Sequence, residues 1–196
     1  MAIQWAKLFG AKNIVVTASP RSNQPALKVG ATDWIDYTKG EQNEVKEFKE
    51  FVKASGKFDL IVDAVRDVSF HSNLHEILKS KSEGGKLSVV AGSFSKSHTP
   101  HYLDMLPSLR FARTFGRFLI GLSSFNIDLI MAKYNETFGA DFKKLVESGT
   151  FHLRVDSVLD FYTQHQEAYD KVYSDKNVGK VILTLAKGFK SAASAE

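Results

Sequence analysis

The chain has 196 residues, 43% of them hydrophobic, and contains no cysteine, which excludes disulfides, thiolate zinc sites and cysteine nucleophiles. Its formal net charge is +4, from 26 basic and 22 acidic residues, without a dense run of lysine and arginine. This composition favours a mildly basic globular protein over one that binds nucleic acid. No stretch approaches the roughly 18 apolar residues of a membrane-spanning helix, and no secretory signal is recognisable. Residues 1–12 have a mitochondrial presequence as an alternative interpretation, although they lack arginine.

Helical and strand patterns alternate at short spacing through residue 93, which indicates βαβ units and a parallel sheet. The expected helices cover 2–9, 26–30, 38–56 and 68–85, and the expected strands cover 13–18, 31–37, 57–65 and 86–93. The third helix carries one apolar stripe, formed by Val45, Phe48, Phe51 and Val52. The unbroken apolar run at 60–62 predicts a strand that is covered on both faces.

The second half begins less regularly. Between residues 94 and 128 we expect a short helix followed by the last strand of the sheet, at 117–125. The alternative is a basic amphipathic surface helix with Arg110, Arg113 and Arg117 on one face, against which two glycines argue. Beyond this segment the pattern predicts a helix over 129–149, a strand over 152–159, a helix over 161–175, a strand over 179–185 and a disordered tail.

Five sequence segments together resemble a known family. They are AIQWAKLFGAKNIVVTAS, KVGATDWIDY, FDLIVDAV, GGKLSVVAG and the C-terminal LVESGTFHLRVDSVLDFYTQHQEAYDKVYSDKNVGKVILTL. In this order they resemble the medium-chain dehydrogenase/reductase superfamily, in its zinc-independent quinone oxidoreductase-like branch, near the fungal Yim-type proteins. The resemblance implies an α/β fold with an incomplete Rossmann-like, doubly wound parallel sheet. It also implies a partial dinucleotide-binding domain at 1–150, a strand-helix-strand of the missing catalytic domain at 151–185, and a tail at 186–196.

In this family a first strand and a glycine-rich turn precede the helix that here starts at Ala2, so the resemblance implies an N-terminally truncated chain. That first strand is central in the order 3-2-1-4-5-6. Its loss would leave unsatisfied backbone groups on both neighbouring strands, at about 1–3 kcal/mol for each buried group. Three outcomes stay open: the neighbouring strands close up, the chain is poorly stable, or the gene is incompletely described.

A candidate cofactor site follows the first two expected strands. NAD-binding domains usually carry an acidic residue after the second strand of the fold, for the ribose 2′-hydroxyl. Here the loop reads Ser19, Pro20, Arg21 and Ser22, and serine and arginine can bond a 2′-phosphate. The resemblance implies the same NADPH preference and adds Tyr37 near that phosphate. It also implies backbone contacts to the cofactor at Ala64, Val65, Gly92 and Ser93, with Arg66 where the family prefers glycine.

Other constellations carry little chemistry. His71 and His75 lie four residues apart without a third ligand, and His98 and His101 lie in a loop, so we expect no metal site. No nucleophile elbow occurs. Hydride transfer depends on the cofactor more than on a protein acid or base, and we name no catalytic residue.

We therefore expect an NADPH-dependent quinone or enone oxidoreductase-like protein, with cofactor binding and activity weakened or lost in this chain. The rivals are a non-catalytic interaction module and a protein that binds a lipid surface through residues 105–122. The expected partners are a small quinone or enone substrate and a second copy, paired through the 117–125 strand. The expected location is cytoplasmic, with the lipid droplet and the mitochondrion as alternatives that the resemblance implies.

Overall fold

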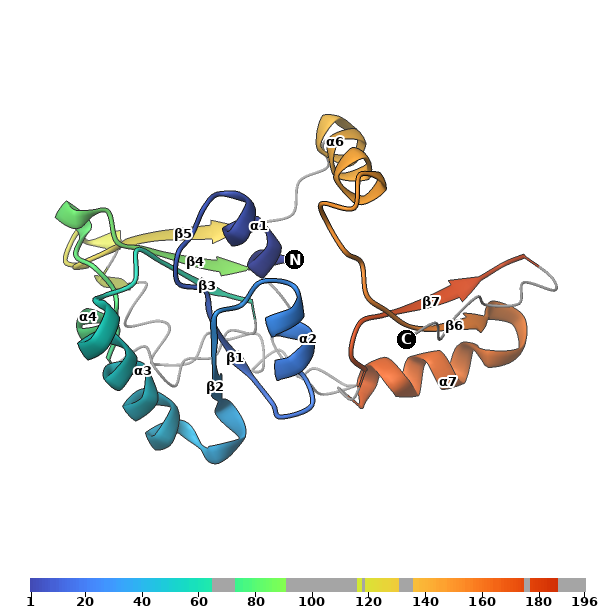
Figure 1. Cartoon of the computed structure of the whole chain (residues 1–196), viewed down its shortest axis with the longest axis horizontal. Helices are drawn as coiled ribbons and strands as arrows, with labels where there is room; N and C mark the ends of the chain where they lie inside the picture. Colours follow the sequence, from blue (N-terminus) through green and yellow to red (C-terminus); the bar gives the residue numbers. More distant parts are fainter. Residues whose placement is uncertain (65–72, 91–115, 118, 131–135, 175–176, 187–196) are drawn as a thin grey trace. The chain divides into compact units, whose positions relative to one another are not determined.

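The protein divides into two compact units. A computed structural model describes residues 1–64, 73–90, 116–117, 119–130, 136–174 and 177–186 (Figure 1). The first unit combines Met1–Ser19 with Ala31–Tyr134, and the second combines Pro20–Gly30 with Asn135–Glu196.

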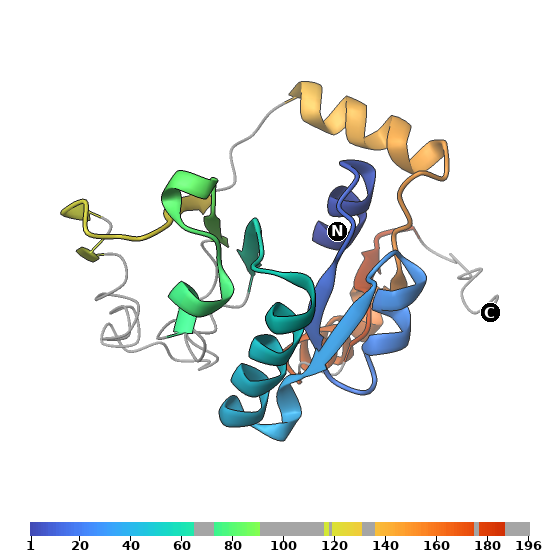
Figure 2. The same cartoon turned by 60° about the vertical axis from the view of Figure 1, so that its left-hand side comes forward.

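The first unit contains a parallel two-stranded sheet. It consists of β1 (Val15–Ala18) and β2 (Asp33–Asp36), in the register Val15↔Asp33. The hydroxyl of Thr32 fixes that register, because it accepts the Ile14 N–H at 2.9 Å and donates to the Ile14 carbonyl oxygen at 3.3 Å. The helical segments of this part are α1 (Ala2–Leu8), η1 (Tyr37–Lys39) and α3 (Glu41–Ser55). Figure 2 shows α3 alongside β2.

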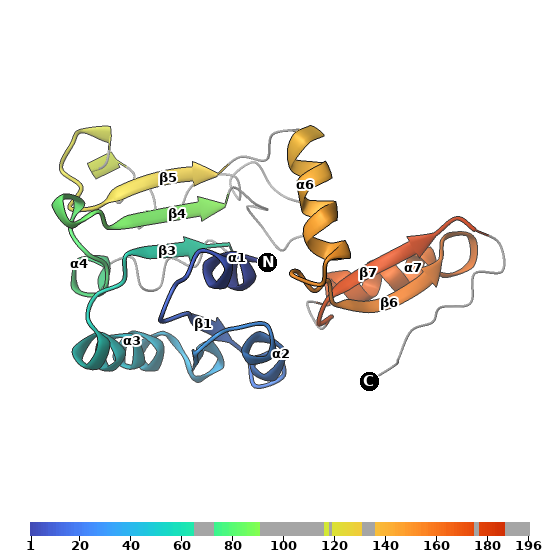
Figure 3. The ribbon, with the colours of Figure 1, turned by 45° about the horizontal axis from the view of Figure 1, so that its top comes forward.

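A parallel three-stranded sheet completes the first unit. Its strands lie in the order β3 (Leu60–Asp63), β4 (Lys86–Val90) and β5 (Asn126–Ile130), which Figure 3 shows side by side. Two short helical segments, α4 (Leu74–Ile77) and η3 (Lys81–Glu83), precede β4. Within the described residues β1 and β3 belong to different sheets, so these two strands do not pair with each other.

The core of the first unit lies on one face of this three-stranded sheet. Its buried members are Leu74, Ile77, Leu78, Leu87, Val89, Phe125 and Ile127. From α3, the side chains of Val45, Phe48 and Val52 pack against this cluster, and the Phe51 ring stacks on Phe58 with centroids 5.4 Å apart. The helix stripe expected from the sequence is confirmed, and it makes α3 a cover for the core.

The double glycine before β4 has two separate causes. Gly84 ends η3 in the left-handed conformation, at φ +86°, which glycine adopts without steric cost. Gly85 has an ordinary backbone, but a Cβ there would lie 1.8 Å from the carbonyl oxygen of Lys79. The Gly85 carbonyl also accepts the Asn126 N–H at 2.9 Å, which aligns β5 with β4. Gly85 is therefore a close-packing residue.

The second unit contains three helices and one parallel strand pair among its described residues. They are α2 (Asn23–Lys28), α6 (Glu136–Glu147), β6 (Val155–Asp160), α7 (Phe161–Tyr173) and β7 (Lys180–Thr184). α7 packs against both β6 and β7 (Figures 1 and 3). Leu159 of β6 and Ala168 of α7 are buried. Phe151, 2% exposed, follows α6 and contacts the Phe142 ring edge to face.

Two aspartates tie the strand-helix-strand together. Asp156 in β6 forms an ion pair with Lys171 of α7 at 2.7 Å and accepts the Val178 N–H at 2.9 Å. These contacts, led by the bond from Lys171, hold the pKa of the Asp156 carboxyl below its usual value. Asp160 caps α7 by accepting the backbone N–H groups of Tyr162 and Thr163, which lowers its pKa as well.

Three expectations are wrong. The last strand of the sheet is β5 at 126–130, where we expected the start of a helix, and the described residues of 117–125 form no strand. Phe125 and Ile127 are buried, whereas Asn126 is half-buried and Asp128 is exposed. This alternation is typical of a strand, but it covers too few residues to be recognised in the sequence. The helix expected over 68–85 is reduced, where described, to α4 and η3. Finally, β3 is not covered on both faces, because Leu60 and Val62 are 50% and 41% exposed.

Candidate cofactor-binding site

The candidate site lies at the carboxyl ends of β1 and β2. In the register of this pair, Ala18 lies opposite Asp36. The next residue of each strand is a predicted site residue, so Ser19 and Tyr37 follow β1 and β2 at the same edge of the sheet. Ser19 is half-buried, whereas Tyr37 is 50% exposed. The carboxyl edge of a parallel sheet is where open α/β folds bind their ligands.

Asp36, the acidic residue at this edge, forms hydrogen bonds with the nearby Thr38. The Asp36 carboxylate accepts the backbone N–H of Thr38 at 2.9 Å and the Thr38 hydroxyl at 2.6 Å, and Asp36 is buried. It therefore caps η1. The sequence analysis did not single out Thr38, although an aspartate followed two residues later by threonine is typical of such a cap. Ser19 and Tyr37 thus follow the strands at the same edge as Asp36, and the Asp36 carboxylate already accepts two hydrogen bonds from Thr38.

The remaining predicted site residues divide into three groups. Ala64 directly follows β3 and is exposed. Arg21 and Ser22 belong to the second unit, where Arg21 is exposed and half-buried Ser22 immediately precedes α2. Three predicted site residues, Val65, Gly92 and Ser93, lie outside the described residues. So does Arg66, the arginine where the family prefers glycine.

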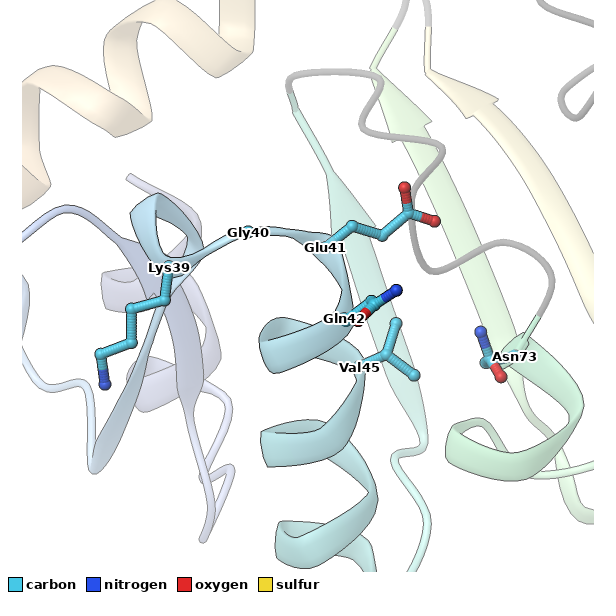
Figure 4. A pocket seen from close by; sticks show the side chains of 6 residues that line it. All are labelled: Lys39, Gly40, Glu41, Gln42, Val45 and Asn73. Carbon is cyan, nitrogen blue, oxygen red and sulfur yellow. The ribbon is translucent and has the colours of Figure 1, made fainter.

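An open hollow of about 690 Å³ lies at the start of α3 (Figure 4). Its lining residues are Lys39, Gly40, Glu41, Gln42, Val45 and Asn73. The Lys39 side chain points away from Asn73 and pairs with Glu47 at 3.4 Å. None of the five predicted site residues that the structure describes is among the lining residues of this hollow.

The described residues include neither a metal-binding cluster nor a membrane-spanning helix. They contain no group of three or more histidine, aspartate or glutamate side chains that could hold a metal ion. His75 is described and lies beside Glu76 at 3.9 Å, whereas His71, His98 and His101 lie outside the described part. Among the described helices, none is long and apolar enough to cross a membrane.

Sequence comparison gives a family and a set of fungal relatives. The profile of the family described as zinc-binding dehydrogenase matches residues 1–129. Protein YIM1-2 of Lachancea thermotolerans is 27% identical over 176 residues, which cover 89% of this chain and 47% of that protein. The chain thus spans about half the length of the curated relatives it matches.

Solved structures with the same fold are also about twice as long. The quinone oxidoreductase from Coxiella burnetii superposes with a TM-score of 0.66 at 17% identity, over 94% of this chain and 48% of that one. CurA from Vibrio vulnificus, in complex with NADPH, gives a TM-score of 0.65 at 17% identity, over 95% and 53%. At this identity the likeness shows the fold, which is part of a Rossmann-like domain with parallel strands. Because the family profile matches more than half of its residues, the chain belongs to the zinc-binding dehydrogenases of the medium-chain dehydrogenase/reductase superfamily.

Proposed function

We propose that the chain carries the part of an NADPH-dependent quinone or enone oxidoreductase that recognises the adenosine 2′-phosphate. The observation that carries this proposal is the carboxyl edge of β1 and β2. Ser19 and Tyr37 follow register partners at this edge, and the neighbouring carboxylate of Asp36 is bonded to Thr38.

The chemistry of this edge suits a phosphate better than a ribose hydroxyl. The Asp36 carboxylate is buried, and its Oδ1 accepts two bonds from Thr38, so a ribose 2′-hydroxyl would have to compete with Thr38 for this oxygen. Hydroxyl groups donate to phosphate oxygens. Arg21, two residues beyond Ser19 in the chain, carries a guanidinium, a group that can donate two parallel bonds to a phosphate.

The proposed activity requires little of the protein beyond binding and orientation. When bound, a reduced nicotinamide supplies a hydride, and a proton from solvent completes the two-electron reduction of an enone or quinone. The residues of this chain would hold the phosphate end and so fix the position of the cofactor. The NADPH-bound state of CurA and the quinone oxidoreductase of Coxiella burnetii support the cofactor and the substrate class by likeness of fold.

The test is a titration of the purified full chain with NADPH and with NADH. Fluorescence of Trp5 and Trp34 reports binding, and calorimetry provides an independent signal. We expect micromolar affinity for NADPH and affinity for NADH at least about tenfold weaker, because each charge-assisted bond to the phosphate contributes roughly 1.5–3 kcal/mol.

Two exposed basic residues provide a matched pair of variants. Arg21→Glu should weaken NADPH binding about tenfold or more and leave NADH binding unchanged, whereas Lys28→Glu, seven residues further along, should change neither. Equal losses in both variants would mean that only general charge matters. A folded chain that binds neither nucleotide would overturn the proposal.

A further inference from the structure

A short segment with exposed apolar side chains precedes β5. Where it is described, the segment 116–121 is a helical turn. The side chains of Leu119, Ile120 and Leu122 are 67%, 69% and 62% exposed. Single exposed apolar residues are common on protein surfaces, but a cluster of strongly exposed aliphatic side chains marks an interaction surface. We call Leu119, Ile120 and Leu122 the apolar tip.

The backbone of the apolar tip forms hydrogen bonds within the segment. The Ile120 N–H donates to the Gly116 carbonyl at 3.2 Å, and the Leu122 N–H donates to the Arg117 carbonyl at 2.7 Å. Gly121 lies between them at φ +75°, and a left-handed glycine commonly ends a helix with such a bond. Backbone groups without partners are costly in an apolar environment. These bonds therefore lower the cost of moving the tip from water into such an environment.

The base of the apolar tip is fixed to the three-stranded sheet. Phe125, directly before β5, is 7% exposed and belongs to the core. The Ser123 hydroxyl donates to the Phe125 carbonyl at 2.8 Å, and the Ser124 carbonyl accepts the Lys81 N–H of η3 at 2.6 Å. Figure 3 shows the segment beyond the amino end of β5. Open α/β folds bind their ligands at the carboxyl ends of the strands, so the tip lies at the opposite edge of this sheet.

The sequence around the apolar tip has an excess of positive charge. From residue 105 to residue 127 it contains three arginines and no acidic residue. Among them Arg117, two residues before the tip, is exposed. The next acidic residue, Asp128, forms an ion pair with Lys86 at 3.0 Å, and η3 beside the base carries one charge of each sign, Lys81 and Glu83. The excess charge therefore comes from the arginines.

We propose that the apolar tip inserts into the surface of a membrane that contains anionic phospholipids. The aliphatic side chains would enter the boundary between headgroups and acyl chains, and the Arg117 guanidinium would bond headgroup phosphates. The apolar side chains require an apolar partner, and the arginines favour an anionic one. A second copy of the chain, paired tip to tip, would bring the same positive charges together. Charge therefore favours the lipid surface.

The experiment measures binding of the full chain to lipid vesicles by co-sedimentation. One kind of vesicle contains phosphatidylcholine with about one third phosphatidylserine, and the other contains phosphatidylcholine alone. We expect the partition coefficient to be at least about fivefold higher for the anionic vesicles. This difference should shrink when the salt concentration is raised to about 1 M, because salt screens the arginines. The inference does not rest on the proposed function, because no nucleotide is present.

Two variants, each with a matched control, test the two parts of the proposal. Leu119→Ser should lower the partition coefficient about tenfold, whereas Leu185→Ser, at a leucine that is 64% exposed in the second unit, should not. Arg117→Glu should lower binding to anionic vesicles about tenfold and leave binding to neutral vesicles unchanged. Arg154→Glu, at another exposed arginine, should change little. Circular dichroism checks that each variant retains the fold.

A fluorescent label provides a second measurement that does not depend on a loss of binding. Because the chain contains no cysteine, a single cysteine can be labelled specifically with an environment-sensitive dye. With Ile120→Cys, we expect the emission to shift to the blue when anionic vesicles are added, because the dye enters an apolar environment. With Leu185→Cys, we expect no shift.

Four results would overturn the proposal. The first is equal binding to both kinds of vesicle, or binding to neither. The second is an equal loss in Leu119→Ser and Leu185→Ser, and the third is an unchanged emission of the label at position 120. The fourth is a dimer by light scattering that Leu119→Ser dissociates, which would make a second copy the partner of the tip.

Discussion

The two units of the molecule are stabilised by different interactions. The first unit buries an apolar cluster in which Leu74, Leu87 and Val89 are each 1% exposed. The strand-helix-strand of the second unit buries little beyond Leu159 and Ala168 and leaves several aromatic side chains of α7 exposed. Its strands and helix are joined instead by the contacts of Asp156 and Asp160. Burial is insensitive to pH, whereas carboxylate bonds depend on ionisation, so the units should respond differently to the same change of conditions.

The largest expected effect is in the core of the first unit. Leu87→Ala removes a side chain that is 1% exposed, and we expect the free energy of unfolding to fall by about 2–5 kcal/mol. Leu60→Ala is the matched control, because Leu60 lies on the adjacent strand and is half exposed. Urea denaturation followed by circular dichroism measures both. Equal losses would show that the described cluster is not the core.

A smaller effect is expected at the close contact before β4. Gly85→Ala places a methyl group against the Lys79 backbone, which cannot move without disturbing its bond to Phe58, and should cost about 1–3 kcal/mol. Gly139→Ala in α6 meets nothing within 4 Å and should stabilise by about 0.5–1 kcal/mol, because alanine favours a helix. Thermal unfolding of the pair measures the opposite signs. The same sign in both would contradict the structure.

The smallest effect belongs to the second unit and depends on pH. Asp156→Asn weakens the bonds to Lys171 and Val178 and should cost about 1–2 kcal/mol at neutral pH. Since the folded pKa of Asp156 lies below its ordinary value of 3.8, this stabilisation is complete above that value and is lost as pH falls through the lower folded pKa. Asp141→Asn, at an exposed pair with Lys144, is the control and should change little.

Hydrogen exchange of α7 between pH 6 and pH 3, a range around the ordinary aspartate pKa, measures this dependence. We expect protection in α7 to fall toward the acidic end in the unchanged chain and to vary less in Asp156→Asn. Protection in α3 should stay nearly constant over the same range. If α3 and α7 lost protection together, the proposed contrast between the units would be wrong.

The sequence predicted those parts of the fold that local patterns determine. The stripe of α3 has a clear helical period, and the family and the α/β class with parallel strands are confirmed. β5 was missed because its alternation covers few residues, and the longer apolar run at 117–125 was assigned as the last strand instead. The exposure of Leu60 could not be predicted from the sequence. An apolar run indicates that a strand is suited to burial, but it does not show whether other elements cover both of its faces.

The candidate site shows the same limit. The order of Ser19, Arg21 and Tyr37 along the chain predicted a phosphate-binding edge. The register that makes Ser19 and Tyr37 follow paired residues depends on strand pairing, and the capping of η1 by Asp36, which accepts the Thr38 N–H, depends on a local turn. Which groups are available for a ligand therefore follows from three-dimensional contacts, even where the residue types are evident in the sequence.

The spacing of the strand pairs also has a kinetic consequence. Pairing of β1 with β2 joins residue 15 to residue 33, and pairing of β6 with β7 joins residue 155 to residue 180, whereas β4 and β5 join residue 86 to residue 126. The entropy of loop closure rises with the number of intervening residues, so the longest loop should close last during refolding. Until it does, the side chains of Leu87 and Val89 lack Phe125 and Ile127, and a chain diluted from denaturant is most prone to aggregate in that interval.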